Sequence, residues 1–432
     1  MPDAPSAPGR TVVVGGGPAG MLLAYLLARA GLPVTLLERH QDFDREFRGD
    51  SLHPWTLEQL DRLGLADRLL ELPHVRARWF RFHTPRGTIT TSDYGRVDSR
   101  FNFVALMPQA RFLDFLAREA AALPGFELRT GASVNGLIED PDGVERSAGG
   151  TSIGTVTGVR YRVGSDEHEL PAELVVAADG RFSKVRRLAG MTAESMGAQT
   201  DLLWFTLPRR DDDPDDGDVD LYFGDHHYLG LLSGPGRWQV GYSLPKGGIA
   251  AVREAGVEPI RRFVAEQVPW LADRVGLLED MNATTLLSVD ISRVARWHRP
   301  GLLLIGDAAH VISPVGGNGI LMACQDAVAA ANRLVPALRA GTVGEDVLAG
   351  FQLDREPTIR QVQDSQVRTE RKVAAARERG RPITPPAFLR WLTRIPAVRG
   401  RSARRNAYGP NPPWLSPALL GPVARIGDTD RG

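Results

Sequence analysis

The sequence predicts an α/β protein with a mostly parallel sheet, an inserted and mostly antiparallel sheet, and helices towards the C-terminus. Four short, mainly apolar runs have the composition of strands that are covered on both faces: 11–14, 33–38, 174–178 and 302–305. An apolar helix is expected between the first two runs, over 21–30, ending at Gly31. Between 195 and 295 the runs become alternating and aromatic-rich, which is typical of antiparallel strands.

The other elements follow from periodicity and turn residues. Helices are expected over 54–63, 109–122, 317–340 and 345–380. Further strands are expected over 126–129, 159–163, 202–207, 219–223, 228–232 and 238–244. The Gly-rich stretch 147–158 reads as a hairpin loop, and the acidic run 211–217 reads as a solvated turn, because it has no histidine and no calcium-loop spacing. No metal site is expected.

Composition excludes several classes of protein. The 432 residues include 52 Lys and Arg and 52 Asp and Glu, so no net charge steers the protein towards nucleic acid or a lipid surface. The basic segment 368–405 lacks interleaved aromatic residues and is interpreted as a solvated helical face. Cys324 is the single cysteine, the first ten residues do not resemble a signal peptide, and no apolar stretch approaches the length of a membrane span. We expect a soluble, cytoplasmic protein.

The first βαβ unit carries a dinucleotide-binding motif. Gly15-Gly16-Gly17-Pro18-Ala19-Gly20 fits G-x-G-x-x-G and lies directly between a strand and a helix. In this motif Gly15 permits the tight turn, Gly17 lets the backbone approach a diphosphate, and Gly20 lets the helix pack closely on the strand. Glu38 and Arg39 follow the second strand, where an acidic side chain accepts hydrogen bonds from an adenosine ribose. This unit alone does not distinguish FAD from NAD.

Two distant segments favour a flavin. Asp179-Gly180 and Gly306-Asp307 each follow a buried strand, at the edge where ligands of open α/β sheets bind. Asp307 is placed to hold a ribityl hydroxyl. Backbone N–H groups at the start of the next helix are expected to face the flavin ring, and the residues concerned are Gly316, Gly317, Asn318 and Gly319. The predicted fold is therefore a Rossmann-type, GR2-like FAD-binding domain.

With these three motifs in this order, the sequence resembles the group A flavoprotein monooxygenases of the para-hydroxybenzoate hydroxylase type, from about residue 11 to 370. The resemblance implies that Arg48 lies near the flavin, that Gln109 contacts the cofactor, and that Pro314 lies beside the reacting flavin edge. It also associates Asp179, Gly180 and Arg181 with both FAD and NAD(P)H. The helix after the Gly306-Asp307 segment lacks the commoner asparagine-threonine pair, so the flavin edge is expected to differ.

The resemblance implies domain boundaries. The FAD-binding domain is expected over 10–194, with a small sheet excursion at about 70–105, and again over 296–380. The substrate-binding sheet is expected over 195–295, and a helical or irregular tail over 381–432. A monomer or homodimer is expected.

The resemblance also implies the reaction. NADH or NADPH, a transient co-substrate, reduces FAD, and O2 then forms a flavin C4a-hydroperoxide. One oxygen atom is inserted into an aromatic or polyketide-like small molecule, in secondary metabolism or aromatic degradation. We found no second nucleotide fingerprint for NAD(P)H.

The catalytic residues are predicted to be Arg48, His53 and Pro314. His53 and His310 both fall in loops expected to border the flavin, and histidine suits removal of a phenolic proton, but neither is assigned as the base. Trp204, Tyr222, Tyr228 and Trp238 are predicted to bind substrate, and His226 and His227 are further candidates for the wall. Two other hypotheses remain at this point: a flavin-dependent oxidase or dehydrogenase of the same fold, and a non-catalytic FAD-fold binding protein.

Overall fold

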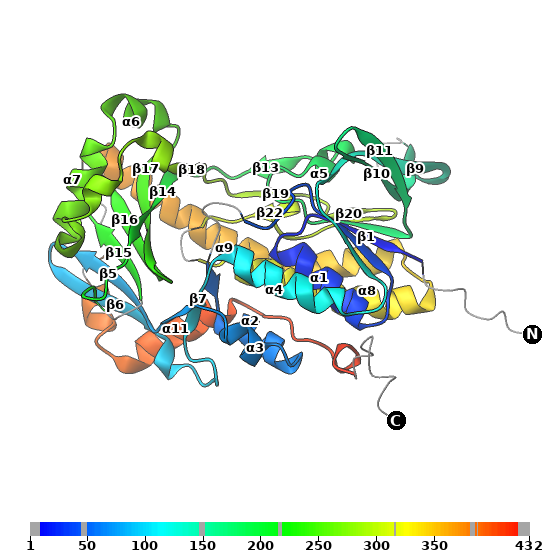
Figure 1. Ribbon diagram of the computed structural model, residues 1–432, viewed down its shortest axis with the longest axis horizontal. Helices are drawn as coiled ribbons and strands as arrows, with labels where there is room; N and C mark the ends of the chain where they lie inside the picture. Colours follow the sequence, from blue (N-terminus) through cyan, green and yellow to red (C-terminus); the bar gives the residue numbers. More distant parts are fainter. Residues whose placement is uncertain are drawn as a thin grey trace, which may run out of the picture.

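A computed structural model describes residues 9–44, 50–146, 152–214, 218–314, 317–380, 385–386 and 388–421. Two large sheets lie at opposite ends of the molecule, and the long helix α9 (Glu345–Glu378) runs from one towards the other (Figure 1). The described helices contain none that is long and apolar enough to cross a membrane.

The first sheet has six strands and is parallel except at one edge. Its order is β20-β21-β12-β1-β2-β8, and only β20 runs antiparallel to its neighbour. The strands are β1 (Thr11–Val14), β2 (Val34–Leu37), β8 (Phe126–Arg129), β12 (Leu174–Ala177), β20 (His298–Arg299) and β21 (Leu302–Leu304). All residues of β1, β2, β12 and β21 are buried. The predicted parallel sheet is thus confirmed.

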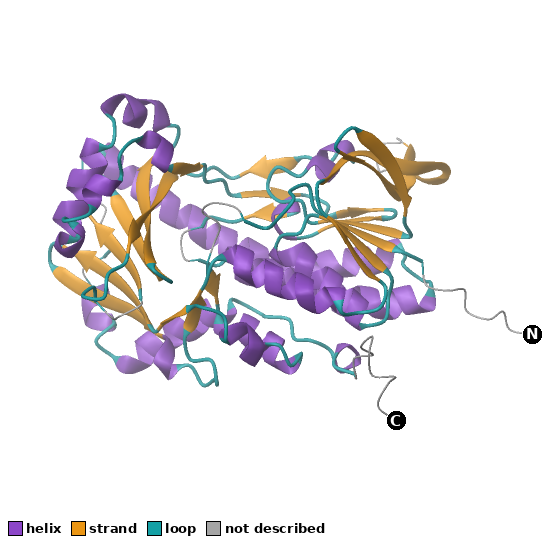
Figure 2. Cartoon of the chain, in the orientation of Figure 1, coloured by secondary structure: helices purple, strands orange, loops and turns teal. Residues whose placement is uncertain are grey.

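Helices cover one face of this sheet, as Figure 2 shows. They are α1 (Pro18–Arg29), α4 (Gln109–Ala121) and α8 (Gly319–Ala340), and α1 packs against both of the others. The opposite side carries a three-stranded sheet of order β11-β10-β9. Its strands are β9 (Ala132–Arg146), β10 (Ser152–Val163) and β11 (Asp166–Pro171).

The second large sheet has seven strands of order β18-β14-β17-β16-β15-β5-β6. Strand β15 pairs parallel with β5 and all other neighbours pair antiparallel. The strands are β5 (Trp79–Thr84), β6 (Gly87–Asp93), β14 (Thr200–Pro208), β15 (Val219–Phe223), β16 (Tyr228–Gly234), β17 (Arg237–Pro245) and β18 (Thr285–Leu287). Helices α6 (Ile249–Ala255) and α7 (Glu258–Gln267) lie beside it. The predicted, mostly antiparallel sheet is confirmed.

Smaller elements complete the fold. Two more sheets have three strands each. One contains β3 (Ser51–Leu52), β7 (Val104–Leu106) and β4 (Val75–Ala77). The other contains β13 (Ala193–Ser195), β19 (Ser292–Val294) and β22 (His310–Val311). The remaining α-helices in the described part of the chain are α2 (Pro54–Arg62), α3 (Ala66–Leu70), α5 (Lys184–Leu188), α10 (Leu389–Leu392) and α11 (Pro396–Tyr408).

Three expectations need correction. The hairpin loop expected over 147–158 is too long, because β10 begins at Ser152; residues 147–151 lie outside the described residues. Strands are present within 70–105 as expected, but β5 and β6 belong to the seven-stranded sheet and not to the six-stranded sheet of the first half. Within the acidic run, Asp213 is buried and forms an ion pair with the buried Arg274 at 2.7 Å, so this run is not simply a solvated turn. Residues 215–217 of the run lie outside the described residues.

A buried carboxylate joins the first sheet to the two long helices. Asp326 of α8 accepts a hydrogen bond from the backbone N–H of Gly306 at 2.8 Å, just after β21. Its two oxygens also contact His310 Nε2 at 2.7 Å and Arg355 Nε of α9 at 2.8 Å. Burial opposes ionisation of Asp326, but the neighbouring His310 and Arg355 outweigh it and lower its pKa to about 2. Asp326 is therefore ionised at neutral pH.

We expect Asp326→Ala to lower the free energy of unfolding by roughly 3–5 kcal/mol, because it leaves Arg355 buried without its carboxylate. The matched control is Asp354→Ala, which removes the exposed pair of Asp354 with Arg333, and should cost less than about 1 kcal/mol. Urea unfolding of both variants at neutral pH measures the difference. Equal losses would contradict the role assigned to Asp326.

Candidate functional site

The dinucleotide motif has the geometry that its glycines predict. Gly15 has a φ of 105°, and a Cβ there would lie 2.4 Å from the carbonyl oxygen of Ala178. A Cβ on Gly20 would lie 2.0 Å from the carbonyl oxygen of Gly15, so only glycine allows this close helix packing. A Cβ on Gly17 would meet nothing within 4 Å. Gly17 precedes Pro18 at the start of α1, whose N-terminus has no side-chain cap.

Glu38 lies at the carboxyl end of β2, and its carboxylate is held by backbone groups. Oε2 accepts from Gly16 N at 2.7 Å and Oε1 accepts from His40 N at 3.0 Å. The side chain is buried beside the dinucleotide loop, as expected for a group that accepts ribose hydroxyls. Arg39 is exposed, and its Nε donates to His40.

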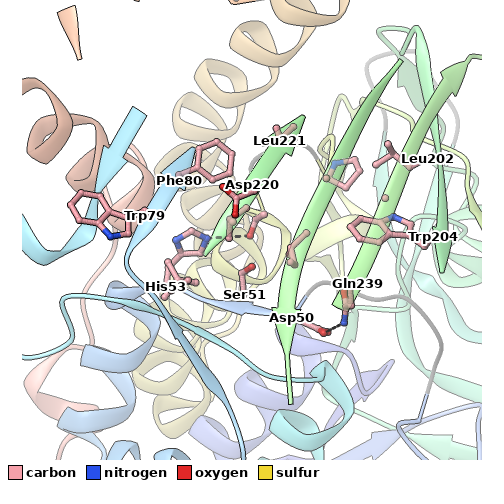
Figure 3. A pocket seen from close by; sticks show the side chains of 18 of the residues that line it. Asp50, Ser51, His53, Trp79, Phe80, Leu202, Trp204, Asp220, Leu221 and Gln239 are labelled. Carbon is pink, nitrogen blue, oxygen red and sulfur yellow. Dashed lines mark hydrogen bonds between the residues drawn. The ribbon is translucent and has the colours of Figure 1, made fainter. Parts of the chain in front are cut away.

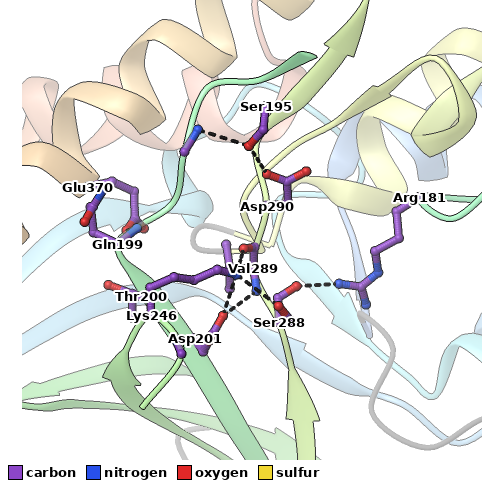
Figure 4. A network of polar contacts seen from close by, with 12 residues as sticks. Arg181, Ser195, Gln199, Thr200, Asp201, Lys246, Ser288, Val289, Asp290 and Glu370 are labelled. Atoms are coloured by element: carbon purple, nitrogen blue, oxygen red, sulfur yellow. Dashed lines mark hydrogen bonds and ion pairs between the residues drawn. The ribbon is translucent and has the colours of Figure 1, made fainter. Parts of the chain in front are cut away.

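The Asp179-Gly180 segment is held in place by hydrogen bonds of its own. Asp179 holds the start of α5, because its carboxylate accepts from Oγ of the N-cap residue Ser183 at 2.5 Å and from Lys184 N at 2.7 Å. Arg181 Nη1 donates to the carbonyl of Ser288 at 2.8 Å, at the edge of the polar network in Figure 4. In that network Lys246 Nζ also donates to Ser288 Oγ at 2.9 Å, so the segment is linked to the seven-stranded sheet.

Sequence reasoning missed Arg186, which joins the two aspartate segments. Its buried guanidinium donates to the carbonyl of Ala308 at 2.8 Å and to that of Arg181 at 2.9 Å. Ala308 lies beside Asp307, which is exposed at the end of β21. One arginine therefore aligns Asp179-Gly180 with Gly306-Asp307.

The N-terminus of α8 is a second uncapped helix end. Asn318 precedes the helix without making a side-chain cap, and Asn318 Oδ1 is buried with no hydrogen-bond partner among the described residues. A Cβ on Gly319 would meet nothing within 4 Å. Gly317 has a φ of 69°, and its N–H donates to the carbonyl of Pro314 at 3.0 Å. Gly316 lies outside the described residues.

These features fit FAD. Two uncapped helix N-termini present N–H groups, α1 for the diphosphate and α8 for the carbonyl side of the flavin ring. The open space at Gly17 and Gly319, and the buried, unpartnered oxygen of Asn318, are consistent with a bound molecule on this side of the sheet. In the described part of the chain, Glu38 and Asp307 are the carboxylates that would accept its hydroxyl groups.

His53 and Pro314 lie together at the predicted catalytic edge, and both line the same cavity. His53 Nε2 donates to the carbonyl of Gly317 at 3.2 Å. Burial lowers the pKa of His53 to about 4, so it is neutral at physiological pH and Nδ1 carries a lone pair. Nδ1 is buried and has no hydrogen-bond partner among the described residues. Arg48 lies outside the described residues.

His310 does not line the cavity. It is buried, pairs with Asp326, and packs against Trp297 at a ring distance of 4.9 Å. Its place in the structure is therefore beneath the Gly306-Asp307 segment.

The cavity lies between the flavin-side loops and one face of the seven-stranded sheet. Its volume is about 1020 Å³, including the space open at its mouth. Figure 3 shows Trp79, Phe80 and Trp204 around it, with His53 and Ser51 at the flavin side. Tyr94 and Tyr228 add two more aromatic side chains to the lining. The lining is mainly apolar, which suits a ring-containing molecule.

Two of the four predicted substrate residues reach this cavity. Trp204 and Tyr228 line it, whereas Tyr222 and Trp238 do not. Trp238 packs with the core on the face towards α7, and its Nε1 donates to Asp213 at 2.7 Å. Tyr222 stacks on His83 at a ring distance of 4.2 Å. Since successive residues of a strand point to opposite faces, Gln239 takes the cavity-side position next to Trp238.

The two further histidine candidates also lie away from the cavity lining. His226 is exposed in the turn before β16. His227 Nδ1 donates to the carbonyl of Ser243 at 2.7 Å, and its ring stacks on Tyr242.

Sequence reasoning missed two polar residues of the cavity, Asp50 and Gln239. Gln239 Nε2 of β17 donates to Asp50 Oδ2 (Figure 3). The backbone N–H of Gln109 at the start of α4 also donates to this carboxylate. Burial raises the pKa of Asp50 to about 6, against the lowering effects of Gln239, Arg237 and Arg111. Gln109, predicted to contact the cofactor, thus lies beside the cavity. A buried aspartate just before a short strand had no distinguishing pattern in the sequence.

Comparisons with known proteins identify the family. The family model described as "FAD binding domain" matches residues 10–366. The chain is 35% identical to a 6-methylpretetramide 4-monooxygenase of Streptomyces rimosus over 94% of both chains. It is also 29% identical to a rifampicin monooxygenase of Streptomyces venezuelae, over 82% of this chain and 69% of the relative.

The chain belongs to the FAD-binding family of group A flavoprotein monooxygenases. It is an enzyme of the oxidoreductase class, and the resemblance to the para-hydroxybenzoate hydroxylase type is confirmed. Among solved structures, PqsL of Pseudomonas aeruginosa in complex with 2-aminobenzoylacetate is 21% identical, with a TM-score of 0.70 over 86% of this chain and 99% of that chain. Because the two sequences are 21% identical, this structural similarity supports the fold alone.

Two glycine variants separate cofactor binding from folding. Gly17 has an extended backbone with φ of −73°, which alanine adopts without strain, so Gly17→Ala should unfold like the wild type but bind FAD at least about tenfold more weakly. Gly20→Ala should instead lower the free energy of unfolding by roughly 2 kcal/mol or more through overpacking. Flavin titration and urea unfolding test both. Normal FAD affinity in Gly17→Ala would contradict the assigned position of the diphosphate.

Proposed function

We propose that this flavoprotein consumes NADH or NADPH and O2 and hydroxylates an aromatic, polyketide-like small molecule with fused rings, in secondary metabolism. The observation that carries the proposal is the cavity, whose aromatic and apolar lining continues to the flavin-side residues Pro314 and Gly317. The relative of Streptomyces rimosus, named for a monooxygenase acting on 6-methylpretetramide, supports the substrate class.

We infer the following division of work among the chain's residues. Gly15 to Gly20, Glu38 and Asp307 hold the dinucleotide, and the start of α8 faces the flavin ring. When bound, FAD supplies the electron acceptor for NAD(P)H and the ring at which O2 is activated. Trp204, Phe80 and Trp79 exclude water and hold the substrate ring, which keeps reduced oxygen from being lost as H2O2. His53, being neutral, offers a lone pair at Nδ1.

We also propose a domain division in which residues 195–295, together with β5 and β6, form the substrate-binding part. The shared seven-stranded sheet supports this division. Residues 10–78, 94–194 and 296–380 contribute the greater part of the FAD-binding half, because β8 and β12 of the six-stranded sheet lie within 94–194.

The proposal is tested with the purified yellow enzyme. NADH and NADPH oxidation should be stimulated by a fused-ring phenolic substrate more than by single-ring phenols. Under ¹⁸O2 the product should gain one labelled oxygen atom, measured by mass spectrometry, with little H2O2. If every substrate tried gave only H2O2, the flavin-dependent oxidase reading would replace this one.

Trp204 gives a prediction about the cavity wall. Its ring lies over Gly241, where a Cβ would be 3.0 Å from the indole. Trp204→Ala should raise KM at least about tenfold and increase H2O2 release, because the substrate loses an aromatic contact and water enters. The comparison is Trp238→Phe on the opposite face, which should lower the melting temperature with KM little changed. A larger effect of Trp238→Phe on KM would contradict the assignment of faces.

A further inference from the structure

Asp50 and Gln239 meet across the boundary between the two halves of the molecule. Asp50 directly precedes β3, and Gln239 lies within β17 of the seven-stranded sheet. Their side chains are hydrogen-bonded, both are buried, and both line the cavity (Figure 3). A carboxylate in this position is costly, because a pair of apolar side chains would join the two halves without desolvating a charge.

Asp220 and His53, two other polar residues of the lining, differ from Asp50 in their hydrogen-bond partners. Asp220 is fixed by Arg81 Nε at 2.8 Å and by His83 Nε2 at 2.7 Å, and these partners keep its pKa low despite burial. His53 donates to a backbone carbonyl through Nε2. Asp50 has amide donors as its hydrogen-bond partners, Gln239 and the backbone of Gln109. A carboxylate can accept about four hydrogen bonds, so these two leave capacity for a ligand.

We propose that Asp50, oriented by Gln239, is the hydroxyl anchor of the substrate: its carboxylate accepts a hydrogen bond from a phenolic hydroxyl of the ring system. The inference rests on the proposed function and deepens it, since it selects phenols over ring systems without a free hydroxyl. A charge-assisted hydrogen bond is strong in a water-poor cavity. Gln239 is a positioning residue, because it acts through Asp50.

The charged and titratable groups around the carboxylate set its pH dependence. Arg237 of β17 and Arg111 of α4 favour its ionised form, whereas burial disfavours it, and the result is a pKa of about 6. His53 is neutral above a pKa of about 4, and Asp220 stays ionised. The anchor is therefore a carboxylate above about pH 6 and a neutral acid below it, and its preference for a phenol should weaken as pH falls through this value.

The test is equilibrium binding to the oxidised holoenzyme, without NAD(P)H. The probes are 2-naphthol and 2-methoxynaphthalene, in which a methyl group replaces the hydroxyl proton. The flavin absorbance reports their binding. The wild type should bind 2-naphthol at least about tenfold more tightly than the methyl ether near pH 8, and less selectively near pH 5. Asp50→Asn should reduce this preference to below about threefold at both pH values. Asp220→Asn, the second carboxylate of the same cavity, should retain the preference.

Thermal unfolding of Asp50→Asn excludes a merely structural role. Burial raises the folded-state pKa of Asp50 above its ordinary 3.8, so the ionised carboxylate destabilises the fold increasingly from about pH 4 to 6 and fully above that. Asp50→Asn should therefore have a higher melting temperature than the wild type near pH 8, and a smaller advantage near pH 4. A variant that lost both stability and the preference near pH 8 would overturn the anchor.

Three further outcomes would also overturn it. They are an undiminished preference in Asp50→Asn, a wild type that binds both probes equally, and a wild type that does not bind 2-naphthol. Failure of the anchor can be distinguished from failure of the proposed function. Labelled product without a phenol preference removes the anchor alone, and a phenol preference without labelled product removes the monooxygenase proposal alone.

Discussion

The buried carboxylate of Asp326 fixes the geometry on which the flavin side of the cavity depends. It holds the backbone N–H of Gly306, and therefore the turn that places Asp307 at the end of β21. Because the same carboxylate contacts His310 and Arg355, the turn, β22 and both long helices share one electrostatic centre. Removing any one partner would leave the others desolvated, so the arrangement is rigid where the cofactor family requires a fixed edge.

The seven-stranded sheet performs two tasks because its strands alternate. One face packs a hydrophobic core against α7, which includes Trp238, Val240 and Tyr242. The other face presents Trp204, Gln239 and Gly241 to the cavity. Gly241 has no side chain, so the Trp204 ring lies flat over β17. A shift of one residue in the register of β17 would exchange the core and cavity sets.

Local signals in the sequence predicted the parallel sheet, the glycine motif and the helices over 109–122, 317–340 and 345–380. These features depend on residues close in sequence, such as Gly15 and Gly20. Features that depend on distant pairing were not accessible. The parallel pairing of β5 with β15 recruits 79–93 to the second sheet, and Arg274 buries Asp213 within an acidic run. Trp238 was assigned to the substrate because an aromatic residue shows no facing direction until the register is known.

Burial of the side chains determines the charge of the two titratable groups Asp50 and His53 in the cavity. Desolvation favours the neutral form of any group, so it raises the pKa of the acid Asp50 and lowers that of the base His53. Between about pH 4 and pH 6 both are neutral, and above about pH 6 the pair carries one negative charge. In the proposed mechanism, the apolar lining that limits release of H2O2 therefore also makes a single carboxylate the most discriminating polar contact of the cavity. An acid with a more exposed side chain would be ionised at all physiological pH values, but water would compete with the substrate for its oxygens.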